Sequence, residues 1–252
     1  MSERSVQVYP DSAALLAAGA AMFTARIGRA QAAHGSASAV LTGGGTGIGM
    51  LEAVRENSAD VDWSQLDIFW GDDRFVPAGD PDRNDLQARR ALLDHVPIDP
   101  ARVHPMATSD DSPDPAAAAA VYRSLVQSFL AEHGAFDLHL LGIGPEGHMN
   151  SLFPHSDAVR EQHNLVVAVT NSPKPPPARV TLALPAVHRA RHVALVVAGA
   201  GKAEAVAAAI AGADPDDVPA AGAIGIESTT WFLDAGAASR LQAGADDQPR
   251  TS

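Results

Sequence analysis

The chain has 252 residues, and 46% of them are hydrophobic, so it can bury a full core without metal or disulfide support. It contains no cysteine, which excludes disulfide frameworks, thiolate nucleophiles and cysteine-ligated zinc, and which fits our expectation of a cytoplasmic location. Its formal net charge of -12 argues against a nucleic-acid partner, because binding to a phosphate backbone requires a basic face.

The predicted elements alternate between strands and helices along the chain. The N-terminal segment 12–33 is rich in alanine but carries Arg26, Arg29 and Gln31, so it indicates an amphipathic helix rather than a signal or a membrane span. In chain order we expect a strand at 6–9, a helix over 12–31, a strand at 37–41, a helix over 50–56, a strand at 66–70, a helical stretch over 85–94, a helix over 115–132, strands at 136–141, 165–170, 179–184 and 192–198, a helix over 202–210 and a strand at 229–233.

Apolar strands that are separated by helices indicate an α/β fold. We expect one Rossmann-like catalytic domain over residues 1–240, with a mostly parallel central sheet and helices on both of its faces. Residues 241–252 are polar and are expected to form a flexible tail. Ligands of such folds bind beyond the carboxyl ends of the strands, which directs attention to the loops at 42–49, 71–84 and 142–154.

The first of these loops is glycine-rich, with the sequence Thr42-Gly43-Gly44-Gly45-Thr46-Gly47-Ile48-Gly49. Glycines let backbone N–H groups approach an anion closely, and the start of the following helix adds a favourable partial charge. The pattern therefore predicts phosphate binding.

The same letters match the nucleotide loop of short-chain dehydrogenases, but the catalytic Tyr-x-x-x-Lys pair of that family is missing. Ala13 stands four residues after Tyr9, Val126 stands four residues after Tyr122, and the chain has no other tyrosine. We therefore expect no cofactor.

The second loop begins with Asp72, Asp73 and Arg74 directly after the strand at 66–70. An isolated Asp-Asp-Arg segment is usually a solvated turn with an internal ion pair. Here the preceding apolar run aims it at the ligand-binding edge of the sheet, which favours a functional interpretation.

The third loop carries His148, which follows a glycine-rich turn at the start of a short helix expected over 149–153. A histidine at this place can expose one ring nitrogen to the cleft while Glu146 orients the ring. Since the pKa of imidazole is ordinarily about 6.5, His148 is suited to act as a general base at neutral pH.

Other hydrolytic chemistries lack their residues. No Gly-x-Ser-x-Gly motif is present, so a serine nucleophile of the α/β-hydrolase type is not supported. His188 and His192 have helical spacing, but Arg189 replaces the glutamate of a zinc-protease motif, and we expect no metal.

Together, these segments resemble the glucosamine-6-phosphate isomerase/6-phosphogluconolactonase family over most of the chain. The family's glycine loop, its Asp-Glu-Arg-x-Val-Pro segment and its GxGxDGHxxSLFP signature are similar to 41–47, 72–77 and 142–154. Its Arg-x-Thr-Leu segment and its Gly-x-x-Lys helix start are similar to 179–182 and 199–202. The chain departs from the family pattern at Asp73, Arg83 and Glu146, where glutamate, serine and aspartate are usual.

The resemblance implies hydrolysis of a phosphorylated sugar lactone, 6-phospho-D-glucono-1,5-lactone, in the oxidative pentose phosphate pathway. In this interpretation His148 activates water, and Arg74 either stabilises the developing oxyanion or positions the substrate near it. Asp72 and Glu146 are the other expected catalytic residues. Asn84 is a further substrate contact. The residues expected to hold the phosphate are Gly43, Gly44, Gly45, Thr46, Arg179 and Lys202.

Two alternative functions remain. A glucosamine-6-phosphate isomerase (deaminase) would have the same fold, but its motif continues after the histidine toward Asn-Glu-Pro, whereas this chain has MNSLFP. A non-catalytic sugar-phosphate-binding protein would keep the phosphate site without needing the base. We expect a small-molecule substrate, no membrane partner, and a monomer or weak dimer.

Overall fold

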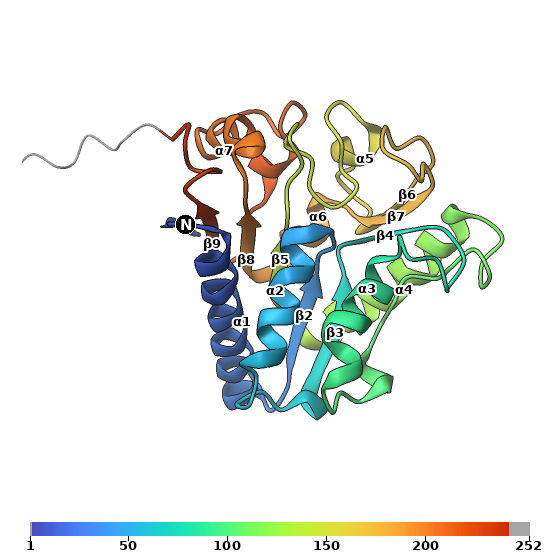
Figure 1. The fold of residues 1–252 in the computed structure, drawn as a ribbon. Helices are drawn as coiled ribbons and strands as arrows, with labels where there is room; N and C mark the ends of the chain where they lie inside the picture. The colour runs from blue at the N-terminus through green and yellow to red at the C-terminus, as the bar shows by residue number, and fades with distance from the viewer. Residues whose placement is uncertain (1, 242–252) are drawn as a thin grey trace, which may run out of the picture.

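The computed structural model describes residues 2–241 and places them in one α/β arrangement (Figure 1). The tail predicted at 241–252 lies, apart from its first residue, outside the described residues. The strands are β1 (Glu3–Tyr9), β2 (Ala37–Leu41), β3 (Leu66–Trp70), β4 (Asp72–Arg74), β5 (Phe136–Leu141), β6 (Val166–Val169), β7 (Arg179–Leu182), β8 (Ala190–Val197) and β9 (Ser228–Asp234). The α-helices are α1 (Ser12–His34), α2 (Gly44–Glu56), α3 (Asn84–Ala91), α4 (Pro115–His133), α5 (Asp157–Arg160), α6 (Leu184–Val187) and α7 (Ala203–Ile210).

The two longest helices begin and end at residues that satisfy their free backbone groups. The side chains of Asp11 and Asp114 each accept a hydrogen bond of 2.8 Å from a backbone N–H in the first turn of α1 and α4. Gly35 and Gly134 follow the last turns with positive φ and donate their N–H groups back to the helix. Local sequence therefore fixes both helices at the predicted places.

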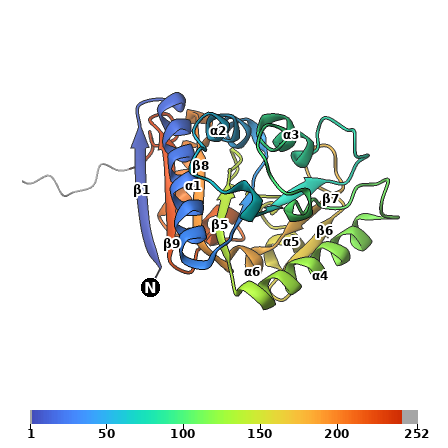
Figure 2. The ribbon, with the colours of Figure 1, turned by 90° about the horizontal axis from the view of Figure 1, so that it is seen from below.

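The central sheet contains six strands in the order β1-β9-β8-β5-β2-β3, and every neighbouring pair is parallel. Alternate strand residues enter two separate apolar cores. Leu138 and Leu140 pack in the core with α1, α2 and α3, whereas Leu141 packs in the core with α4 and α7. Figure 2 shows α1, α2 and α3 on one side of the sheet and α4 and α6 on the other. The predicted parallel sheet with helices on both faces is confirmed.

A second, three-stranded sheet was not expected from the sequence. Strands β4, β7 and β6 pair antiparallel, with Asp72 opposite Thr181 and Arg74 opposite Arg179. The segments predicted as strands at 165–170 and 179–184 are strands, but they lie in this small sheet and not in the mostly parallel one. A short apolar strand looks the same in either setting, because only its long-range partner distinguishes the two.

Two local predictions also need correction. The helix expected over 149–153 is a tight turn, in which Met149 and Leu152 form a bridge and Asn150 has a φ of 50°. The glycine segment is not a loop up to residue 49, because α2 already begins at Gly44, with Gly43 as its N-cap.

The carboxyl ends of the neighbouring strands β5, β2 and β3 bring the candidate residues to one edge of the sheet. Thr42 follows β2, Asp72 follows β3 after one residue, and the turn that carries His148 follows β5. Strand β2 has β5 on one side and β3 on the other, so these segments are neighbours. Among residues 2–241 no helix has both the length and the apolar character needed to cross a membrane.

Candidate active site

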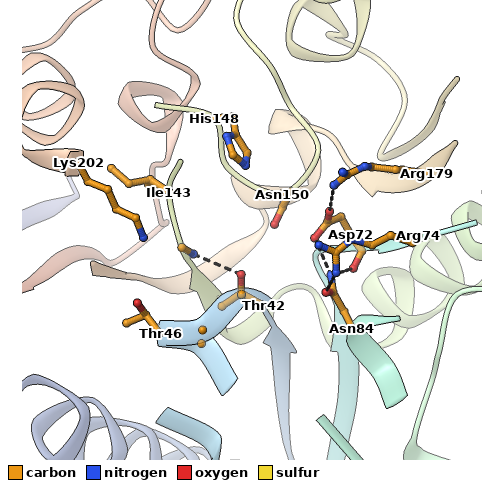
Figure 3. Close-up of a pocket in the computed structure, with 15 residues that line it drawn as sticks. Thr42, Thr46, Asp72, Arg74, Asn84, Ile143, His148, Asn150, Arg179 and Lys202 are labelled. Atoms are coloured by element: carbon orange, nitrogen blue, oxygen red, sulfur yellow. Dashed lines mark hydrogen bonds and ion pairs between the residues drawn. The ribbon is translucent and has the colours of Figure 1, made fainter. Parts of the chain in front are cut away.

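An open cleft lies at this edge of the sheet (Figure 3). It is lined by Thr42, Gly43, Gly44, Gly45, Thr46, Gly47, Asp72, Arg74, Asn84, Gly142, Ile143, His148, Asn150, Arg179 and Lys202. Every residue proposed for catalysis or substrate binding from the sequence therefore borders this cleft, except Glu146.

The N-terminus of α2 forms one wall of the cleft. Gly43 caps this helix of 13 residues, and no side chain among residues 2–241 caps its first backbone N–H groups. Gly44 has a φ of 79°, a conformation that glycine adopts without strain. Free N–H groups and the positive end of the helix dipole together form an anion site.

Lys202 lies across the cleft from Thr46, at the end of a 3₁₀ turn over Ala200–Lys202 that leads into α7 (Figure 3). Burial lowers the pKa of its ammonium group, while Asp234 acts in the opposite direction. Among the described residues, none accepts a hydrogen bond from its Nζ. Lys202 and the α2 N-terminus therefore face the same space and can hold one phosphate between them.

The opposite wall is formed by β4 and the start of α3. Asn84 donates from its amide to the Asp72 carbonyl at 2.8 Å and to Asp72 Oδ1 at 3.1 Å, and its own oxygen accepts from Arg74 Nη1. Arg74 also donates to the carbonyl of Asp82 at 2.7 Å. Its Nε is buried and has no acceptor among the described residues, while the residue itself borders the cleft.

Asp73 points away from the cleft and forms a buried ion pair with Arg83, whose Nη2 lies 3.0 Å from Asp73 Oδ2. Both side chains are at most 1% exposed. Burial raises the pKa of Asp73, while the Arg83 guanidinium and the backbone N–H groups of Asn84 and Arg74 lower it and stabilise the charged form in the ion pair. The departures from the family pattern at positions 73 and 83 therefore contact each other, which their separation in sequence does not reveal.

Arg179 borders the cleft, but its guanidinium is largely engaged by protein atoms. Its Nη2 donates to the carbonyls of Lys174 at 2.9 Å and Pro175 at 3.3 Å, and its Nε donates to that of Pro176 at 3.1 Å. Only Nη1 faces Asp72, with Oδ2 at 3.9 Å (Figure 3). The arginine thus contributes positive charge to the cleft and also fixes the segment that precedes β7.

His148 projects into the cleft between these two walls (Figure 3). Its Nδ1 lies 3.0 Å from Glu146 Oε1, so the carboxylate can accept the proton on this nitrogen. Its ring stacks on Phe153 with centroids 4.6 Å apart. No described residue bonds to Nε2, which leaves this nitrogen free to act on a water molecule.

Burial lowers the pKa of His148, and the Lys174 ammonium lowers it further, while Glu146 and Asp72 raise it. The ring is therefore neutral at physiological pH and can accept a proton. Burial alone would raise the pKa of Glu146. The hydrogen bond from Lys174 and the nearby His148 outweigh this effect and lower the pKa, which keeps the Glu146 carboxylate charged.

Three residues of this region had no role in the sequence interpretation. Lys174 lies 2.8 Å from Glu146 Oε1 and 3.3 Å from His148 Nδ1. Ser151 donates to Asp72 Oδ2 at 2.6 Å. Asn150 borders the cleft, and its amide has no partner among the described residues. Lysine occurs only at 174 and 202, and this rarity is the one signal that could have drawn attention to Lys174.

The cleft is locally positive in a chain that is acidic as a whole. Arg74, Arg179 and Lys202 line it against the single carboxylate of Asp72. An anion site at one end, a neutral histidine in the middle and an arginine at the other end can bind a phosphorylated substrate and direct water at an electrophilic carbon.

Comparison with known proteins indicates the same family as the sequence motifs. A protein-family model described as glucosamine-6-phosphate isomerases/6-phosphogluconolactonase matches residues 10–231. The 6-phosphogluconolactonase of Mycobacterium tuberculosis is 53% identical over 242 residues, which cover 94% of this chain and 98% of that protein. That of Streptomyces coelicolor is 50% identical over 243 residues, or 93% of each chain.

Solved structures agree with the sequence comparison. The 6-phosphogluconolactonase of Trypanosoma brucei superposes with a TM-score of 0.83 at 27% identity, covering 96% of this chain and all of that chain. The matches extend over nearly the whole length on both sides. The chain therefore belongs to the glucosamine-6-phosphate isomerase/6-phosphogluconolactonase family.

Proposed function

We propose that the protein hydrolyses 6-phospho-D-glucono-1,5-lactone to 6-phospho-D-gluconate in the oxidative pentose phosphate pathway. The position of His148 is the observation that carries this proposal, since its Nδ1 is held by Glu146 while its Nε2 faces the cleft. The relatives that are named 6-phosphogluconolactonase support the same substrate.

The reaction needs no covalent intermediate, because a lactone is an activated ester. Water bound to Nε2 attacks the lactone carbonyl carbon and gives its proton to His148. The carbonyl oxygen becomes an oxyanion, which the positive charge of Arg74 stabilises. When the carbonyl re-forms, the bond to the ring oxygen breaks, and His148 returns the proton to that oxygen, which leaves as a hydroxyl group.

The phosphate holds the lactone in place during this sequence. Its oxygens accept hydrogen bonds from the N–H groups of Gly44, Gly45 and Thr46, and Lys202 pairs with its charge. Arg179 adds positive charge from the other wall, and Asn84 contacts the sugar. Binding energy from the phosphate, which does not react, orients the carbonyl toward the water on His148.

One comparison of substrates tests this function against the alternative on the same fold. The purified protein is given the phosphorylated lactone, with the rate corrected for spontaneous opening, and separately glucosamine 6-phosphate, with release of ammonia as the readout. We expect rapid lactone hydrolysis and no enzymatic ammonia. Robust ammonia release would assign a deaminase, and binding of both compounds without turnover of either would assign a sugar-phosphate-binding protein.

The oligomeric state, the domain, the location and the partners of the protein are also proposals. All the residues assigned to the site come from one chain between Gly43 and Lys202, so a monomer or weak dimer with a catalytic domain within residues 1–240 suffices for activity. The absence of cysteine fits work in the reducing cytoplasm, and the charge of -12 disfavours nucleic acid.

A further inference from the structure

Lys174 contacts the edge of the His148 imidazole that carries Nδ1. Its Nζ lies 2.8 Å from Glu146 Oε1 and 3.1 Å from Oε2, and 3.3 Å from His148 Nδ1. It is not among the residues that line the cleft. The ammonium group therefore contacts the two side chains that define the proposed base without facing the substrate.

The backbone around Lys174 is fixed by several hydrogen bonds. Its carbonyl accepts from Arg179 Nη2 at 2.9 Å and from Ser172 Oγ at 2.9 Å, and its N–H donates to the same Ser172 Oγ at 3.2 Å. The backbone N–H of Ser172 donates to the carbonyl of Pro177 at 3.1 Å, which closes the segment on itself. These contacts fix the backbone of Lys174, so the position of its ammonium group does not depend on the ion pair with Glu146 alone.

The contacts distinguish Lys174 from an ordinary surface ion pair. Its side chain is 43% exposed, and a pair between two such groups contributes little to stability. The ammonium is nevertheless shared between the carboxylate and the edge of an imidazole that is itself mostly buried. A cation at this position opposes protonation of the ring, while the carboxylate that it holds accepts the proton on Nδ1.

We propose that Lys174 is a positioning residue for lactone hydrolysis: together with Glu146 it orients His148 with Nε2 toward the cleft and keeps the ring unprotonated between turnovers. This inference rests on the proposed function, because it assumes that His148 is the base. Lys174 acts through Glu146 and His148, and neither the lactone nor its phosphate touches it.

Other charged groups surround the histidine, and the effect of Lys174 has to be separated from theirs. Asp72 favours the protonated ring, as Glu146 does. The charged groups that lie around the ring on the neighbouring segments are Glu146, Lys174, Asp72, Arg74, Arg179 and Lys202. Among the described residues, only Lys174 and Glu146 lie within hydrogen-bonding distance of Nδ1. The Nδ1 proton is donated to Glu146, so Lys174 acts on the ring as a neighbouring charge and as the partner of that carboxylate.

The decisive experiment measures the pKa of His148 directly, by NMR titration of histidine labelled with ¹³C at Cε1, and the pH profile of kcat/KM for the phosphorylated lactone. In Lys174→Met the cation is lost, so the pKa of His148 rises and the acid limb of the profile moves to higher pH with it. We expect roughly a 3-fold or larger loss of kcat/KM on the acid limb and a smaller loss on the alkaline plateau. Lys174→Arg keeps the charge and is expected to retain both values.

Two further variants make the result specific. Glu146→Gln removes the carboxylate, so the pKa of His148 falls and the acid limb moves to lower pH, opposite to Lys174→Met. Arg55→Met removes a cation from the exposed end of α2 and leaves both readouts unchanged. An identical pKa of His148 in Lys174→Met and the wild type would overturn the role of Lys174.

The two readouts separate failure of this inference from failure of the proposed function. The titration of His148 tests the effect of Lys174 on the ring whatever the substrate is. If the wild type does not hydrolyse the lactone, the proposed function fails, and the positioning role falls with it even where the titration moves. A second outcome is that the wild type hydrolyses the lactone while Lys174→Met shifts the pKa of His148 but not the acid limb of the kcat/KM profile. In that case His148 is not the base, which also overturns the role proposed for Lys174.

Discussion

The main chain at Gly144 passes so close to His148 that no side chain fits between them. A Cβ at this position would overlap the imidazole and lie within contact of Glu146 Oε2. Glycine is therefore required here because of a close approach, rather than because of backbone conformation. The position of the ring against its carboxylate depends on this absence of a side chain.

Replacement of Gly144 by alanine should displace the histidine while leaving its chemistry intact. We expect kcat for lactone hydrolysis to fall by about 10-fold or more, because a small misplacement of a catalytic group is costly, while KM changes little. Gly79→Ala is the matched control, since a Cβ at Gly79 meets no atom within 4 Å. Steady-state kinetics of both variants provide the measurement, and equal kcat values would contradict the packing argument.

Sequence alone predicted the individual residues of the site better than their partners. Thr42, Asp72 and His148 could be placed because each follows an apolar strand, and parallel strands bring their carboxyl ends together. Lys174 could not be placed, since it reaches His148 from a proline-rich segment 26 residues further along, through a contact that no local pattern encodes. The same holds for the pairing of Asp73 with Arg83.

At the level of elements, α2 and the turn before α7 supply the two halves of the proposed phosphate site. The sequence predicted both halves, but it placed the glycines of 43–46 in a loop, whereas the structure uses Gly44 onward as the first turn of the helix. This difference matters for mechanism, because a helix start presents N–H groups in a fixed direction.

Lys202→Met should weaken binding of the phosphate without altering the chemical step. A charge-assisted hydrogen bond contributes about 1.5–3 kcal/mol, so kcat/KM for the phosphorylated lactone should fall by about 10- to 100-fold. The unphosphorylated glucono-1,5-lactone serves as the internal control, and its slower hydrolysis should be unaffected. An equal loss with both lactones would show that Lys202 serves the reaction rather than the phosphate.

Strand β4 depends on a buried charge pair for its attachment to α3. The Asp73 carboxylate accepts from the backbone N–H groups of Arg74, Asn84 and Asp85 at 2.7–3.2 Å, and Arg83 neutralises it. Both β4 and α3 carry residues that line the cleft. The Asp73–Arg83 pair therefore fixes one wall of the cleft without lining it.

Arg83→Met should therefore destabilise the fold strongly, because it leaves an uncompensated carboxylate in the interior. We expect a loss of about 3–5 kcal/mol in the free energy of unfolding. Arg89→Met provides the comparison, since Arg89 pairs with Asp85 at 3.9 Å on the surface and should contribute about 1 kcal/mol or less. Denaturant unfolding measures both, and similar small losses would show that Asp73 is not charged in the folded state.

At the scale of the whole molecule, the central sheet and its two cores were predictable from the apolar runs, because helices between such strands require a parallel, doubly covered sheet. The small antiparallel sheet was not, since β4 has only three residues and two of them are aspartates. The molecule thus carries its cleft where the two sheets meet, with β4 and β7 forming one wall beside the ends of the parallel strands.

The centre of the parallel sheet also contains a histidine with a consequence for acid stability. His139 on β5 is fully buried without a hydrogen-bond partner among the described residues, and burial lowers its pKa to about 3. The unfolded chain binds this proton below about pH 6.5 and the folded chain does not. Stability from this group is therefore complete above pH 6.5 and is lost as the pH falls toward 3.

His139→Leu should reduce the dependence of unfolding on acid pH. Between about pH 6.5 and 3 one such group contributes a slope of up to roughly 1.4 kcal/mol per pH unit, and the leucine variant lacks it. Unfolding free energies measured at pH 8 and pH 4.5 provide the test, with the exposed His155→Leu as control. A slope in His139→Leu equal to that of the wild type would contradict the assignment.

One kinetic comparison tests whether His148 activates water to open a phosphorylated lactone. The initial rate of 6-phospho-D-glucono-1,5-lactone hydrolysis is measured for the wild type and for His148→Ala, after subtraction of spontaneous opening. We expect a rate well above the background for the wild type, a loss of about 100-fold or more in kcat for the variant, and largely retained binding of 6-phospho-D-gluconate. A variant that turns over at nearly the wild-type rate would contradict this role of His148.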